Sequence, residues 1–176
     1  MKRYGMVAGA AIMLAACGSN TTPTPTPTTP PNTIVFNATL NAANEVPPIT
    51  NAEANGKGTA TITFNLTRDA SGAITAGTAN FVYSLNTFPA GSTVTLSHIH
   101  NAPAGQTASP FINTGQTAAN GITIAGDGSV TNVTFSNIAM TAAQAQAVID
   151  NPAGHYFNVH TTLNGGGAAR GQLVRQ

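Results

Sequence analysis

Apolar and polar side chains alternate strictly in several short runs of this chain, and this pattern constrains the fold more than any other feature. In residues 61–66, Ile62, Phe64 and Leu66 alternate with two threonines and an asparagine. Successive side chains of a β-strand point to opposite faces, so such a run has one face for a core and one for solvent. Similar runs occur at residues 81–85, 94–96, 122–124 and 133–135, and residues 33–40 are rich in strand-forming types. The pattern predicts an all-β domain.

Turn-forming residues separate these runs, and only one segment has a helical pattern. Glycine, proline, asparagine or aspartate cluster at residues 55–56, 70–72, 89–91 and 126–128. The single helix is expected over residues 141–149, with Thr141 as its N-cap and Asn151-Pro152 as its stop. Many short strands with one short helix predict a Greek-key β-sandwich or flattened barrel.

The first 32 residues have the composition of an export signal followed by a tether. A positively charged start and an apolar stretch of about a dozen residues are typical of a signal peptide, here residues 1–16. The stretch ends at Cys17 in a motif that resembles the lipobox of bacterial lipoproteins, in which this cysteine is lipidated. Residues 17–32 are rich in proline and threonine and would form the tether. We therefore expect an exported lipoprotein, anchored by Cys17 in a membrane of the bacterial cell envelope, at the outer membrane or the cell surface.

The remaining residues, 33–176, have a normal length for one domain and carry few charges. The whole chain has six Lys or Arg and five Asp or Glu, which gives a net charge of +1. A nucleic-acid-binding domain needs a concentrated basic surface to neutralise phosphates. The composition therefore excludes nucleic acid as a partner.

All four histidines of the domain lie in two short segments of the sequence. His98 and His100 lie two residues apart, so in a strand both imidazoles project from the same face. The other two histidines, His155 and His160, flank a second strand-like run. Imidazoles that converge from two strands can share a metal ion, although a His-x-His pair also occurs as ordinary half-buried strand residues. The pattern favours a metal site.

Four sequence blocks together resemble the chordin-type (CHRD) domain. They are residues 44–48, 97–100, 156–161 and 170–173, and they occur in the order expected for that family across nearly all of the domain. The resemblance implies an all-β domain. It is also compatible with a non-catalytic module that binds another envelope or surface-layer protein.

The chain has a more distant resemblance to copper/zinc superoxide dismutases, in which a Greek-key barrel carries a His-x-His strand, a later copper ligand and an arginine. His98, His100, His160 and Arg170 occur here in that order. The resemblance implies a copper site that converts superoxide into dioxygen and hydrogen peroxide. Imidazole nitrogens suit copper, and the Arg170 guanidinium would attract and orient the anion as a catalytic residue.

Departures from the superoxide dismutase pattern define the expected site more closely. The only cysteine is Cys17, and no histidine lies between His100 and His155. The bridging and zinc ligands are therefore missing, so we expect one copper ion and no zinc. His155 is the candidate for a fourth ligand, although its odd offset from His160 requires a bulge or strand end after Gly154.

Parity along the two histidine strands predicts a further irregularity. His98 and His100 share parity with Val94 and Leu96, whereas His160 alternates with the apolar Val159. Both histidine sets cannot face one site unless one strand breaks register.

Three other residues have both a functional and a structural interpretation. Glu45 could orient a ligand imidazole or close a loop. Tyr156 could line the site or pack in the core. Arg170 could act on the substrate or form an ion pair with Asp150 or Glu45. Two hypotheses therefore stand: a copper-only superoxide dismutase-like enzyme, and a non-catalytic CHRD module.

Overall fold

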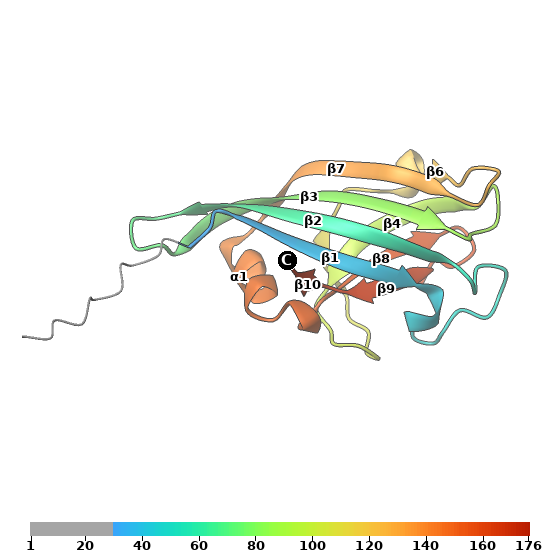
Figure 1. Cartoon of the computed structure of the whole chain (residues 1–176), viewed down its shortest axis with the longest axis horizontal. Helices are drawn as coiled ribbons and strands as arrows, with labels where there is room; N and C mark the ends of the chain where they lie inside the picture. The colour runs from blue at the N-terminus through green and yellow to red at the C-terminus, as the bar shows by residue number, and fades with distance from the viewer. Residues whose placement is uncertain (1–29) are drawn as a thin grey trace, which may run out of the picture.

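The computed structural model describes residues 30–176 (Figure 1). The signal peptide, Cys17 and most of the tether lie outside the described residues. The elements in chain order are β1 (Thr33–Asn41), η1 (Ala42–Asn44), β2 (Lys57–Arg68), β3 (Ile74–Asn86), β4 (Thr93–His100), β5 (Pro110–Asn113), η2 (Ala118–Asn120), β6 (Ile122–Thr123), β7 (Val130–Met140), α1 (Ala142–Asp150), η3 (Pro152–Gly154), β8 (Tyr156–Thr161), β9 (Ala169–Gln172) and β10 (Val174–Arg175).

The strands form one antiparallel sheet that curls into a flattened barrel. Its order is β5-β4-β8-β9-β1-β2-β3-β7, with β6 beside β4 and β10 beside β1. Figure 1 shows β1, β2, β3 and β7 as one layer and β4, β8 and β9 as the layer behind it. Because β3 and β4 follow each other in the chain but are far apart in the sheet order, the topology contains crossovers of the Greek-key type. The predicted all-β flattened barrel with one short helix is confirmed.

The core lies between the two layers and is built by the predicted alternation. In β2, Ile62 and Phe64 are fully buried while Thr59 and Thr61 are exposed. Phe64 packs edge-on against Phe36 of β1, with ring centroids 5.0 Å apart. Each strand of this layer therefore contributes one apolar face to the interior, which is the main source of stability for the domain.

Helix α1 directly follows β7 and packs against β3. It begins after Thr141, whose hydroxyl accepts from the Gln144 backbone, and it ends at Asn151, as predicted. Its Ala145 and Val148 are buried. The Gln144 side chain also donates to the Phe111 carbonyl of β5, at 2.6 Å. Since α1 directly follows β7, this bond connects β7 to β5, the two strands at the ends of the sheet. In residues 30–176, no helix is long and apolar enough to cross a membrane.

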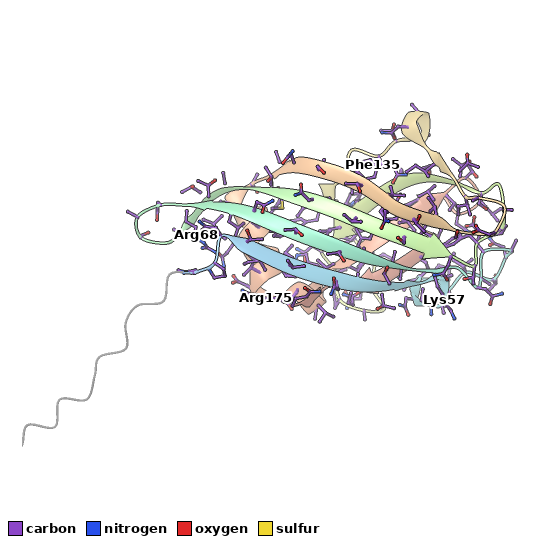
Figure 2. The ribbon with its side chains drawn as sticks, turned by 45° about the horizontal axis from the view of Figure 1, so that its top comes forward. Lys57, Arg68, Phe135 and Arg175 are labelled. Atoms are coloured by element: carbon purple, nitrogen blue, oxygen red, sulfur yellow. The ribbon has the colours of Figure 1, made fainter. Side chains whose placement is uncertain are left out.

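The outer face of the β1-β2-β3-β7 layer is polar but nearly uncharged. Figure 2 shows Lys57 and Arg68 at opposite ends of β2. Between them the outward side chains of β2 are threonines and one asparagine. A polar outer face and an apolar inner face are what the alternating sequence predicts for a sheet that is buried on one side.

The expected break of register lies in β4. Val94 pairs with Thr161 and Leu96 with His160, so one extra residue of β4 opposes β8 at this point. Val94 and Ile99 are both fully buried although they are five positions apart, an odd offset that would put them on opposite faces of a regular strand. The bulge turns His98 and His100 to the face opposite the core. It also places Leu96 on that outer face, contrary to the simple alternation.

Candidate metal centre

The three strands β4, β8 and β9 place the polar residues of the site on the outer face of the barrel. His98 lies opposite Asn158, which lies opposite Arg170. One pair further along, His100 lies opposite Tyr156. His160 projects from the same face of β8, because it is two residues from Asn158. The inward residues of β8 are the apolar Phe157 and Val159.

Three of the four histidines converge. Candidate ligand atoms of His98, His100 and His160 all lie within 4.8 Å of one another, and within residues 30–176 these three form the only group of this kind. His98 Nδ1 and His100 Nε2 are 2.8 Å apart. The exposed fractions of these side chains are only 5, 5 and 6%. The three histidines that the sequence grouped thus lie close together.

Backbone carbonyl groups fix the tautomers of two imidazoles. His100 Nδ1 lies 2.7 Å from the Ala108 oxygen, and His160 Nδ1 lies 2.9 Å from the Gly165 oxygen. A carbonyl oxygen can only accept, so each Nδ1 carries the hydrogen and each Nε2 of the neutral imidazole is an electron-pair donor. His160 Nε2 is buried and has no hydrogen-bond partner among the described residues. This arrangement, in which the second nitrogen donates to a carbonyl, is typical of metal-ligating histidines.

The electrostatic environment keeps these imidazoles neutral. Burial lowers the pKa of His98 to about 3, with smaller contributions from His160 and His100. Burial also lowers the pKa of His100 and of His160, against the opposing effect of their carbonyl partners. A neutral imidazole has the lone pair that a metal requires. All three groups therefore remain potential ligands at neutral pH.

The residues present fit a bound metal ion. Two metal–nitrogen bonds of about 2.0 Å separate their nitrogens by at most about 4 Å, so movements of about 1 Å or less would bring the three imidazoles around one ion. His98 Nδ1 must donate to His100 Nε2 in the metal-free protein, because His100 Nδ1 already donates to Ala108. An ion between these atoms would require the other tautomer of His98. The three histidines could thus hold one metal ion.

His155 is not part of this group. Its Nδ1 lies 2.9 Å from the Asn151 oxygen, and its ring packs against Phe111 with centroids 5.4 Å apart. The backbone is already extended at His155, so no bulge separates it from β8. Five residues of unbroken extended chain place its side chain on the face opposite His160. The structure does not bring His155 to the position required of a fourth ligand.

Arg170 and Tyr156 form a stack beside the histidines. The Tyr156 ring stacks on His100 with centroids 4.6 Å apart and an interplanar angle of 9°. The Arg170 guanidinium lies 4.6 Å from the centre of the Tyr156 ring. Its Nε donates to the Asn44 oxygen and its Nη1 to the Gln106 oxygen, both at 2.7 Å. The Tyr156 ring therefore connects Arg170 to the histidine group. The two hydrogen bonds of Arg170 fix the backbone of the segments that contain Asn44 and Gln106.

Glu45 forms the ion pair with Arg170 that the sequence left open. Its Oε2 lies 3.5 Å from Arg170 Nε, and its Oε1 accepts from Asn158 Nδ2 at 2.9 Å. Burial raises the pKa of Glu45 to about 7, against the opposing influences of Arg170 and Asn158. The carboxylate thus orients an asparagine and an arginine of the sheet, and makes no hydrogen bond to an imidazole.

Two buried residues of the site region were not selected from the sequence. Asn158 lies between Tyr156 and His160 at the same parity of β8, and that parity was a signal that could have found it. Glu53 is fully buried, and its Oε2 accepts from Thr161 Oγ1 and Asn164 Nδ2, both at 2.6 Å. It fastens the 45–56 loop over the end of β8. No short-range pattern in the sequence marks such a contact.

Two surface pockets flank the segment that begins at Glu45. One has a volume of about 390 Å³ and is lined by residues of η1, the 104–105 turn and β9. The other has a volume of about 290 Å³ and lies against the 164–167 loop. Glu45 lines both pockets, whereas none of the three clustered histidines lines either. The pockets therefore approach the site from the Glu45 and Arg170 side.

The comparison with protein families agrees with this arrangement. The model of the CHRD domain matches residues 36–173, which include every strand from β2 to β9 and all residues of the site. Neither the curated proteins nor the solved structures compared with the chain give a match. The matched residues form most of the chain, and the protein therefore belongs to the CHRD domain family.

Proposed function

We propose that this protein binds one copper ion through His98, His100 and His160. The observation that carries the proposal is the pair of Nε2 lone pairs on His100 and His160, fixed by carbonyl partners and directed into a buried group. A buried imidazole nitrogen without a partner is costly unless a ligand uses its lone pair. A metal ion would use all three nitrogens at once.

Copper fits the donor set better than the harder cations. Three neutral imidazoles supply no negative charge, whereas magnesium and calcium prefer carboxylate and carbonyl oxygens. Imidazole suits copper, and copper(II) lies at the top of the affinity order of divalent first-row metals. Glu45, the carboxylate bonded to Asn158, is engaged by Asn158 and Arg170.

Metal analysis of the purified protein tests this proposal, with two histidine variants as a matched pair. His100→Ala should reduce bound copper from about one equivalent to a small fraction, because it removes one of three donors. His155→Ala removes a histidine that is equally buried but outside the group, so it should retain copper. Equal copper content in the two variants, or zinc in place of copper in wild type, would contradict the proposal.

We further propose that the copper site has superoxide dismutase-like activity. Redox cycling of a bound copper ion is the chemistry that this group would supply, and it converts superoxide into dioxygen and hydrogen peroxide. The role of Arg170 in this activity would be to attract the anion, because its Nη2 is buried and has no partner among the described residues. Arg170→Ala should keep the copper but slow superoxide decay, with a weaker dependence on salt than wild type, because the charge that attracts the anion is removed.

The non-catalytic alternative has its own support. The three histidines are almost fully buried, and Arg170 already donates to two loop carbonyls. A site of this kind can bind or store a metal without turnover, and the domain would then serve as a binding or structural module that contacts another envelope protein. Copper-loaded wild type that decays superoxide no faster than buffer with the same free copper would favour this alternative.

The place of action is proposed to be the bacterial cell envelope. Lipidation of Cys17 would anchor the chain in the membrane, and the proline- and threonine-rich tether would hold the domain away from the surface. Membrane fractionation of cells that express wild type or Cys17→Ser tests this. Wild type should follow the membranes, and the variant should be released from them.

A further inference from the structure

We propose that Asn158 supplies the fourth donor of the metal site, through the oxygen of its side-chain amide. The inference rests on the proposed copper site, which it completes. It replaces His155, the only remaining histidine, by a residue that the structure places on the correct face of β8.

The position of Asn158 meets the requirement for a ligand. It is the cross-strand partner of His98, and it lies on the same face of β8 as His160. The side chain is 2% exposed, so bulk water does not reach it freely. The fourth donor is therefore expected from the centre of the same three-strand surface that carries the histidines.

The orientation of the amide group is fixed by Glu45. Asn158 Nδ2 donates to Glu45 Oε1 at 2.9 Å, and Arg170 in turn holds the carboxylate. With Nδ2 directed to Glu45, the amide oxygen points away from that carboxylate. Asn158 Oδ1 has no hydrogen-bond partner among the described residues.

The chemistry of the unpaired atoms identifies the ligand. Asn158 Oδ1 and His160 Nε2 are both buried electron-pair donors without a partner. Neither atom can satisfy the other, because an amide oxygen and a deprotonated imidazole nitrogen only accept. A metal cation satisfies both at once. Because an amide oxygen is a harder donor than imidazole, it should favour copper(II) over copper(I).

Asn158→Leu tests the proposal, since leucine has a similar size and no donor atom. We expect the copper(II) dissociation constant to rise at least tenfold while the copper(I) constant changes less than threefold. A tenfold selective loss of copper(II) affinity raises the one-electron potential by about 59 mV. The electron paramagnetic resonance spectrum of bound copper(II) should also change. Gln172→Leu is the matched control, because it removes a side-chain amide from the same sheet face in β9.

Asn158→Asp keeps an oxygen at the same place but loses the bond to Glu45, so it should bind copper(II) more tightly than Asn158→Leu. Folding of each variant is checked by circular dichroism. The inference is overturned if Asn158→Leu keeps the wild-type spectrum and affinity, as it would if only a water contacted Oδ1. An Asn158→Asp variant that binds copper(II) no more tightly than Asn158→Leu also overturns it. Failure of the copper site itself would appear differently, as wild type binding no more copper than His100→Ala.

Discussion

Apolar inward and polar outward side chains alternate in both β2 and β8, but β2 is buried on one face only whereas β8 is buried on both. In β2 the inward Ile62 and Phe64 are fully buried, while the outward Thr59 and Thr61 are exposed. In β8 all six residues are buried. Its inward side chains are apolar, as in β2, but the 45–56, 101–109 and 162–167 loops cover its outward side chains. The difference between the two regions thus lies on the outer face of the barrel.

Covering polar side chains has an energetic cost that the β2 region avoids. Each buried polar atom loses its water, and the loss is offset only by a new partner. Around β8 several atoms have none, among them His160 Nε2 and Asn158 Oδ1. Buried polar atoms without a partner lower the stability of the region that contains them. Such atoms are common in sites that bind a ligand. The β2 layer therefore serves as scaffold and the β8 layer as site.

The largest expected effect tests whether both regions share one core. Phe157 is the inward residue of β8, and its ring packs against Phe81 and Tyr83 with centroids 5.9 and 5.8 Å away. Phe157→Ala should lower the free energy of unfolding by about 3–5 kcal/mol because it leaves a cavity. Thr59→Val on the exposed face of β2 should change it by less than about 0.5 kcal/mol. Denaturant titration of the metal-free domain measures both values.

The sequence predicted the β2 region almost completely, since alternation there corresponds directly to burial. It also predicted α1 with its Thr141 cap. The register break between Val94 and Leu96 followed from conflicting parities, but its position did not, because a bulge is chosen by packing between strands. His98, His100 and His160 could be grouped in advance by parity and residue type.

What could not be predicted depends on contacts between distant segments. His155 has the same residue type as the three clustered histidines, and only the uninterrupted extended backbone after Gly154 excludes it from the group. The links of Glu45 to Asn158 and of Glu53 to Thr161 join residues more than 100 positions apart. Loop positions of this kind are set by the finished barrel, so local patterns do not contain them.

The second prediction concerns the pH dependence of stability that arises from Glu45, which lies on the loop-covered outer face of β8. Glu45 has a pKa of about 7 in the folded protein and an ordinary value of 4.5. The folded state therefore favours the protonated carboxyl, and the associated stability is present below pH 4.5 and lost as the pH rises through 7. The loss is about 3 kcal/mol at most. Glu45→Gln stays neutral and should lack this loss.

The measurement is the difference in unfolding free energy between wild type and Glu45→Gln, recorded without metal from pH 4.5 to 8. The difference is needed because His98, His100 and His160 act in the opposite direction. Their lowered pKa values give stability that is present above pH 6.5 and lost as the pH falls. A constant difference across this range would mean that Glu45 titrates normally, and that water reaches its carboxyl group on the outer face of β8.

The third prediction concerns how tightly the 162–167 loop covers the site. Gly167 has a φ of 135°, and a Cβ there would lie 2.7 Å from both Asn158 Nδ2 and Glu45 Oε2. Gly167→Ala should destabilise the domain by about 1–3 kcal/mol, since the backbone is strained and the neighbours must move. Gly166→Ala is the control, because a Cβ at that position meets no atom within 4 Å. Similar losses in both variants would show that the loop does not close on Asn158.

The smallest effect is expected at α1, away from both faces compared above. The Thr141 hydroxyl accepts from the Gln144 backbone, and the Gln144 side chain accepts in return from the Thr141 backbone. Thr141→Ala removes the first of these bonds and should cost about 1 kcal/mol, the usual value of a helix cap. Because Gln144 also donates to β5, the loss should exceed that of Thr59→Val. Metal content should stay as in wild type, since α1 contributes no residue to the histidine group. A variant that loses both stability and metal would mean that the closure of the sheet by α1 supports β4 and its histidines, and the division into scaffold and site would then have to include the helix.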